Sequence, residues 1–194
     1  QHGGDAVVVP SEGGHQDFAP QNEIEVELFK YLRSKFGHVS DERILSGPGI
    51  LNVYEFLKKG KYAKESEAVR KALSAKGVEK PGIIMKFANK DKLCKMTTDI
   101  FFSVLGSEAG NLALQAMAFG GVDIVGGLVR LNISVMRKSP FLKSFRHKGR
   151  FSHLMDKFPE MLDRAKVRIS ASLDKLVEKG KLTKDGWTAA ASRI

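Results

Sequence analysis

The sequence is organised around two stretches, EGGHQDFAP at residues 12–20 and HVSDERILSGPG at residues 38–49. The first stretch follows an apolar run, residues 6–10, that predicts a short strand. The glycine pair within it lets the backbone turn sharply or approach a ligand closely, because no Cβ stands in the way. Glu12 and His15 flank this pair. The first stretch therefore predicts a tight turn that presents a carboxylate and an imidazole.

The second stretch predicts the start of a helix that Ser40 caps, with Glu42 in its first turn. An acidic side chain there stays ionised, because it lies near the positive end of the helix dipole. Two ionised acceptors and an imidazole suit a cluster of sugar hydroxyls, since each hydroxyl can donate to a carboxylate and accept from an imidazole. Each hydrogen bond to a charged partner contributes about 1.5–3 kcal/mol. The candidate substrate-binding residues are therefore Glu12, His15 and Glu42.

These two stretches resemble the hexose-binding half of bacterial-type glucokinases, which are ATP-dependent hexose kinases. Gly37 completes the family's Gly-His-Val-Ser pattern at the start of the second stretch. Three more segments follow in the family's order and spacing: AGNLAL at residues 109–114, FGGV at 119–122 and KGRF at 148–151. The resemblance covers roughly residues 6–160. It implies that Glu12, His15 and Glu42 bind glucose hydroxyls.

The resemblance also implies an α/β fold of the actin-like, ribonuclease H-like kinase class, with helices packed on a mixed sheet. Residues 1–162 would form the large lobe of this fold, with a variable insertion near residues 61–90. Residues 163–194 depart from the family pattern and predict a divergent, basic and helical C-terminal tail.

Caps and apolar spacing predict the helices. Asn22 starts the first and Gly37 stops it, whereas residues 46–49 punctuate the chain before the third. Gly106 and Ser107 are expected to interrupt the longest helical pattern. Helices are expected over residues 23–36, 50–57, 65–75, 91–105, 108–118, 131–138 and 141–145, with a loop over residues 76–82.

A glycine-bracketed apolar segment, residues 120–128, predicts a buried strand that ends at Gly126 and Gly127. Two glycines at the end of a strand leave room for a flat ring or a phosphate against bare backbone. In glucokinases a strand that ends in two glycines resembles the segment that contacts the adenosine of ATP. The resemblance therefore implies that Gly126 and Gly127 bind ATP. Asp123 departs from the family pattern, and a carboxylate in a central strand costs stability unless it finds a partner.

The reaction implied by the resemblance is transfer of the ATP γ-phosphate to the 6-hydroxyl of glucose, with Mg²⁺. In the family, the catalytic aspartate lies in a small N-terminal lobe, so the base is expected upstream of Gln1 and no catalytic residue is assigned here. Asp17 and Asp41 lie nearest the sugar-binding residues and are interpreted as structural residues that hold turns. The chain is expected to be a fragment that carries the sugar-binding half and is inactive by itself.

Charge distribution leaves alternatives open. The formal net charge is +10, and residues 130–194 hold 16 Lys and Arg against 6 Asp and Glu. A basic final third suits a nucleic-acid or polyanion-binding module. The aromatic residues there favour a core over base stacking, which argues against nucleic acid as a partner; they are Phe141, Phe145, Phe151 and Phe158. The other alternative is a non-catalytic sugar-binding protein.

Composition supports one sizeable domain in a reducing compartment. The 194 residues are 42% hydrophobic, and one cysteine, Cys94, excludes an intrachain disulfide. No apolar run is long enough for a transmembrane helix, and no His, Cys or Asp spacing suggests a metal site. A cytoplasmic protein with glucose and ATP as partners is expected, and a homodimer stays open.

Overall fold

The computed structural model describes residues 11–155 of the 194-residue chain. The predicted strand over residues 6–10 and the predicted tail over residues 163–194 lie outside the described residues. The described elements, with 3₁₀ turns labelled η, are η1 (Gly13–His15), α1 (Glu23–Phe36), η2 (Asp41–Arg43), α2 (Gly47–Lys59), α3 (Glu67–Ser74), α4 (Lys80–Phe87), α5 (Lys92–Gln115), α6 (Gly127–Arg130), α7 (Ile133–Arg137), α8 (Phe141–Arg146), η3 (Gly149–Phe151) and α9 (Ser152–Met155).

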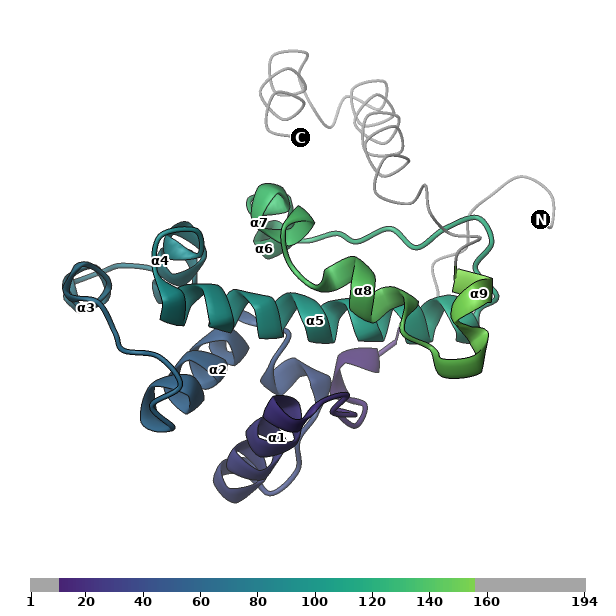
Figure 1. Ribbon diagram of the computed structural model, residues 1–194, viewed down its shortest axis with the longest axis horizontal. Coiled ribbons are helices and arrows are strands. Elements are labelled where there is room, and N and C mark those ends of the chain that lie inside the picture. Colours follow the sequence, from purple (N-terminus) through teal and green to yellow (C-terminus); the bar gives the residue numbers. More distant parts are fainter. Residues whose placement is uncertain (1–10, 156–194) are drawn as a thin grey trace, which may run out of the picture.

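Helix α5 crosses the middle of the molecule, with α1 and α2 on one side and α6, α7 and α8 on the other (Figure 1). It packs directly against α8, α2 and α4. The helices around α5 bury a shared apolar core, in which each large side chain contributes about 1.5–3 kcal/mol. Its buried members include Leu28 and Leu32 of α1, Ile50, Val53 and Leu57 of α2, Leu93, Phe101 and Phe102 of α5, and Phe141 and Phe145 of α8.

The predicted interruption of the longest helix at Gly106 is wrong, because α5 runs unbroken from Lys92 to Gln115. Gly106 faces α8, and a Cβ there would lie 2.2 Å from the carbonyl oxygen of Phe141. The glycine therefore permits the close approach of two helices. Its cost within a helix, about 0.5–1 kcal/mol, is offset by the packing that it allows.

The first two α-helices begin at side-chain caps. Asn22 caps α1 as predicted, with its Oδ1 accepting a hydrogen bond from the Glu25 amide at 3.1 Å. Helix α2 begins earlier than predicted, because the Ser46 Oγ accepts from the Gly49 amide at 3.0 Å. Residues 46–49, interpreted from the sequence as punctuation, are thus the start of a helix.

Two other helices differ from the prediction. The loop expected over residues 76–82 ends early, because the Glu79 carboxylate accepts from the Gly82 amide at 3.0 Å and starts α4. The helix expected over residues 131–138 is shorter, at Ile133–Arg137, and α6 precedes it.

The predicted mixed sheet is not found among residues 11–155, which contain helices and one isolated antiparallel bridge between Asp17 and Ser40. The strand predicted over residues 120–128 is wrong, since residues 121–125 are irregular and Gly127 begins α6. A strand requires hydrogen bonds to a neighbouring strand, and the described part of the chain offers no strand with which residues 120–128 could pair. Asp123 is exposed, so the cost expected for a buried carboxylate does not arise.

Gly49, in the first turn of α2, lies close to the backbone of Ile44. A Cβ at Gly49 would lie 2.3 Å from the carbonyl oxygen of Ile44, so the backbone must move to admit it. We expect Gly49→Ala to lower the free energy of unfolding by about 1–3 kcal/mol.

The matched control is Gly47→Ala, two residues earlier, where a Cβ would meet its nearest neighbour at an ordinary 3.6 Å. Its effect should stay within about 0.5 kcal/mol. Urea unfolding followed by circular dichroism measures both variants, and equal losses of stability would contradict the steric argument.

Candidate functional site

The two stretches that organise the sequence lie against each other in the structure. The Asp41 amide donates to the Gln16 carbonyl oxygen at 3.1 Å, and the Phe18 amide donates to the Val39 carbonyl oxygen at 3.1 Å. The bridge between Asp17 and Ser40 lies between these bonds. These backbone contacts hold η1 and η2 together although the whole of α1 separates them in the sequence.

The structure brings the three predicted substrate-binding residues together. His15 Nε2 lies 3.0 Å from Glu42 Oε2 and 3.9 Å from Glu12 Oε2. Their side chains are exposed by 64% for His15, 92% for Glu12 and 52% for Glu42, so all three can reach a ligand from solvent.

A hollow of about 180 Å³ lies beside two of these residues, His15 and Glu42. Glu12 does not line the hollow, but it lies next to His15, which does. The rest of the lining comes from η2 and the start of α2: Ser40, Arg43, Ser46, Pro48 and Asn52. The volume is below the roughly 300–1,000 Å³ of pockets for drug-sized ligands, which suits a small polar molecule.

The local structure at Glu42 differs from the prediction. Glu42 lies in a three-residue 3₁₀ turn, and Ser40 makes no side-chain cap to it. So short a turn has no α-helical dipole of the kind expected. What places the Glu42 carboxylate is its contact with His15 and the hydrogen bonds that fix the neighbouring backbone.

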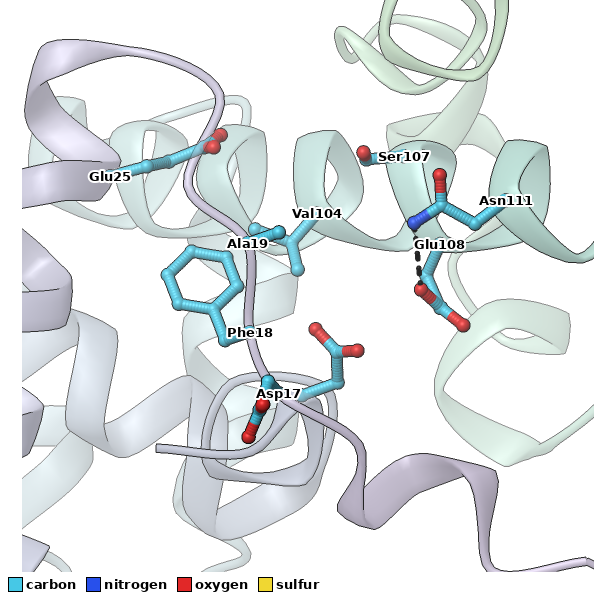
Figure 2. A pocket seen from close by; sticks show the side chains of 9 residues that line it. Asp17, Phe18, Ala19, Glu25, Val104, Ser107, Glu108 and Asn111 are labelled. Atoms are coloured by element: carbon cyan, nitrogen blue, oxygen red, sulfur yellow. Dashed lines mark hydrogen bonds between the residues drawn. The ribbon is translucent and has the colours of Figure 1, made fainter. Parts of the chain in front are cut away.

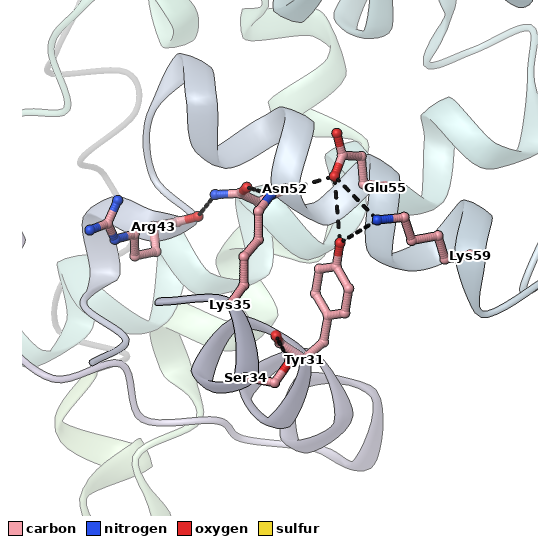
Figure 3. Close-up of polar contacts among 7 residues, drawn as sticks. All are labelled: Tyr31, Ser34, Lys35, Arg43, Asn52, Glu55 and Lys59. Atoms are coloured by element: carbon pink, nitrogen blue, oxygen red, sulfur yellow. Dashed lines mark hydrogen bonds and ion pairs between the residues drawn. The ribbon is translucent and has the colours of Figure 1, made fainter. Parts of the chain in front are cut away.

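Asn52 of α2 supplies one of those hydrogen bonds. It is 8% exposed, and its Nδ2 donates to the Arg43 carbonyl oxygen at 3.0 Å while its Oδ1 accepts from Lys35 Nζ at 3.1 Å (Figure 3). The Ser46 hydroxyl donates to the Glu42 carbonyl oxygen at 2.7 Å. Helix α2 therefore fixes both carbonyl groups that follow Asp41.

Surface contacts around Glu55 join α1 to α2 beside this site (Figure 3). Glu55 Oε2 lies 3.5 Å from Lys35 Nζ, 3.5 Å from the Tyr31 hydroxyl and 3.9 Å from Lys59 Nζ. Exposed ion pairs of this kind contribute about 0–1 kcal/mol each, so they orient the two helices more than they stabilise them.

A second cavity, of about 20 Å³, lies beneath the two turns and faces α1 and α5. In Figure 2, Glu25 of α1 stands on one side of the segment 17–19, and Glu108 and Asn111 of α5 stand on the other. Asp41 also lines it. Three carboxylates from different parts of the sequence, in addition to Asp17, therefore face this small space.

Sequence reasoning missed two side chains of this cavity, the buried Glu25 and the half-buried Glu108. Glu25 is 1% exposed and accepts from the Gln21 amide at 2.7 Å and the Ser103 hydroxyl at 3.0 Å. The spacing of Asn22 and Glu25, typical of a capping box, was a signal for it. Glu108 accepts a hydrogen bond from the Gln16 side chain, 92 positions away, and no local pattern announces that contact.

Asp41 is 4% exposed, and burial together with the carboxylates of Glu108 and Asp17 raises its pKa from the ordinary 3.8 to about 7. A hydrogen bond from the Gln16 side chain acts in the opposite direction. The Asp41 carbonyl oxygen accepts from the Ile44 and Leu45 amides at 2.9 and 2.7 Å, as a turn-holding residue does. Asp17 differs, with a side chain 90% exposed and 3.6 Å from His38.

The glycines predicted to bind ATP lie apart from this site, at the start of α6, which Figure 1 shows across α5 from α1. Among residues 11–155, apart from the adjacent residues and the backbone of α6, no heavy atom lies within 4 Å of the position that a Cβ would occupy at Gly126 or Gly127. Their backbone is therefore open to a flat or anionic group, even though no strand leads into it.

Residues 11–155 contain no group of three or more His, Cys, Asp or Glu side chains able to hold a metal ion. None of the helices in this part of the chain has the length and apolar character needed to span a membrane.

Comparisons with known proteins identify relatives. A family model described as glucokinase matches residues 1–166. The glucokinase of Nostoc punctiforme is 40% identical over 172 residues, which covers 82% of this chain and 50% of that protein. The glucokinase of Helicobacter acinonychis is 42% identical over 158 residues, covering 80% of this chain and 46% of that protein. The chain thus spans about half the length of the curated relatives it matches.

A solved structure agrees with these relatives. The crystal structure of a glucokinase from an Antarctic psychrotroph matches with a TM-score of 0.64 at 32% identity, over 78% of this chain and 44% of that one. The helices of residues 11–155 therefore belong to a sugar-kinase fold.

The pKa of Asp41 makes stability depend on pH. Between pH 4 and about 7 the unfolded chain has released the Asp41 proton and the folded chain retains it, so rising pH favours unfolding. The contribution of the neutral carboxyl is complete below about pH 4, is lost as pH rises towards 7, and changes no further above that value.

Asp41→Asn keeps the residue neutral, so we expect it to be more stable than the wild type at pH 8 by on the order of 1–3 kcal/mol and similar to it near pH 4. The control is Glu67→Gln, at an exposed carboxylate that does not line the cavity, which should change little at either pH. Thermal unfolding at both pH values tests this, and a less stable Asp41→Asn variant at pH 8 would refute it.

Proposed function

This chain belongs to the glucokinase family, and we propose that it carries the hexose-binding half of an ATP-dependent glucokinase. In the whole protein, the γ-phosphate of ATP would pass to the 6-hydroxyl of glucose. The observation that carries the proposal is the meeting of Glu12, His15 and Glu42 beside a hollow of about 180 Å³.

Each of these side chains has a role that follows from its chemistry. The carboxylates of Glu12 and Glu42 accept hydrogen bonds from sugar hydroxyls, and the imidazole of His15 accepts or donates one. The short contact between His15 and Glu42, 3.0 Å, fixes the direction of the ring. Because glucose is uncharged, its affinity rests on these hydrogen bonds, worth about 1.5–3 kcal/mol each.

For ATP, we propose contact with the open backbone at Gly126 and Gly127. Mg²⁺ accompanies ATP in phosphoryl transfer and neutralises charge on its phosphates. We assign no residue of the described part of the chain to the metal, and none to the base that accepts the hydroxyl proton. The division into a lobe over residues 1–162, an insertion near 61–90 and a tail over 163–194 remains part of the proposal, as do a cytoplasmic location and a homodimer.

The family favours this function over a nucleic-acid or polyanion-binding module. Phe141 and Phe145, in the basic third of the chain, are 4% and 3% exposed and pack in the core. They are therefore not available to stack on bases.

Loss of the Glu42 charge should weaken hexose binding. We expect Glu42→Gln to reduce the affinity for glucose about tenfold or more, because a charged acceptor is lost where hydroxyls bind. Isothermal titration calorimetry with glucose measures this, and Glu67→Gln at the exposed start of α3 is the control that should leave affinity unchanged.

Unchanged glucose affinity in Glu42→Gln would overturn the assignment. Salt provides a second discriminator, because binding of uncharged glucose should vary little between 50 and 200 mM salt, whereas polyanion binding falls steeply. A coupled ATP and glucose assay on this chain addresses the further expectation that it is inactive by itself, and robust turnover would refute that expectation.

A further inference from the structure

His15 and Glu42, two of the residues proposed to bind hexose, each lie next to a residue that is linked to α5 by hydrogen bonds. His15 is followed by Gln16, whose side-chain amide donates to the Glu108 carboxylate. Glu42 is preceded by Asp41, whose amide donates to the Gln16 carbonyl oxygen at 3.1 Å. Glu108 therefore holds η1 directly and η2 through Gln16, although it lies outside the hollow.

Glu108 is itself held in place by neighbouring side chains. Asn111 Nδ2 donates to Glu108 Oε2 at 3.2 Å, and Lys148 Nζ donates to Asn111 Oδ1 at 2.7 Å. The same ammonium donates to the Ser107 carbonyl oxygen at 2.7 Å. Residues 109–114 and 148–151, two of the segments that resemble the family pattern, thus meet beside the carboxylate that supports the two turns.

The charged groups that face Asp41 are mostly acidic. Glu108 faces it from α5, Asp17 from the segment after η1, and Glu25 from α1 across the 20 Å³ cavity. A cation, Lys148, lies near these acids: it contacts Ser107 and Asn111 at the cavity wall and interacts with the charge of Glu108. The cavity has room for about one water molecule, so a further negative charge there would be poorly solvated.

We propose that Asp41 and Glu108 are positioning residues for the hexose: they hold η1 and η2 against α5 while Asp41 keeps its proton, and hexose affinity falls when Asp41 ionises. The inference rests on the proposed function. Ionised Asp41 repels Glu108 and Asp17, which separates η2 from α5 and disturbs the pair formed by His15 and Glu42. The raised pKa of Asp41, about 7, places this change near neutral pH.

The test measures glucose affinity by calorimetry from about pH 5.5 to 8.5 in the wild type, Asp41→Asn and Glu108→Gln. Carbon-13 NMR of the Asp41 carboxyl follows its titration independently of any sugar. In the wild type we expect affinity to fall about fivefold or more as pH rises, with a midpoint that matches the carboxyl titration.

Asp41→Asn should bind glucose at all pH values as tightly as the wild type does at low pH. Glu108→Gln retains an acceptor for Gln16 but removes a charge, so the Asp41 midpoint should move to lower pH. A pH dependence that persists unchanged in Asp41→Asn would assign it to His15 or another group and overturn the inference, as would pH-independent binding in the wild type. Absence of glucose binding at every pH would instead overturn the proposed function, and this inference with it.

Discussion

The close contact between α5 and α8 is the constraint on which the rest of the structure depends. A side chain at Gly106 would collide with the Phe141 carbonyl oxygen, and one at Gly110 would lie 2.5 Å from the Phe145 carbonyl oxygen. Two glycines one helical turn apart thus let α8 lie directly on α5. The chain that follows α8 brings Lys148 to Asn111, and Asn111 in turn donates a hydrogen bond to the Glu108 carboxylate.

The candidate site combines hydrogen-bonded side chains beneath the two turns with exposed side chains above them. Below the two turns, the side chains of Glu25 and Glu108 accept hydrogen bonds from Gln21 and Asn111, and the backbone of Asp41 is bonded to the neighbouring turns. Above them, the side chains of Glu12 and His15 are exposed. Buried polar groups need partners to avoid a large desolvation cost, and satisfied networks of this kind fix a single geometry. The groups proposed to meet the sugar are therefore exposed, while the groups that place them are buried or half-buried.

Much of the helix pattern and of the candidate site could be predicted from local sequence. The Asn22 cap and the Gly37 stop predicted α1, and the two glycine-rich stretches predicted which acids and which imidazole would meet. Local reasoning failed where the explanation was tertiary. Gly106 looks like a helix interruption until α8 is known to lie on it. The partnership of Gln16 with Glu108 depends on how α5 packs, and no periodicity in either segment encodes it.

The two exposed carboxylates beside His15 have a consequence for the proposed phosphoryl transfer. A hexose that arrives neutral and is then phosphorylated gains a charge of about −1.5 to −2, typical of a phosphate monoester near neutral pH. In the function proposed above, Glu12 and Glu42 would attract the hydroxyls of the incoming sugar but repel that new charge. The groups that admit the substrate would therefore also hasten departure of the product.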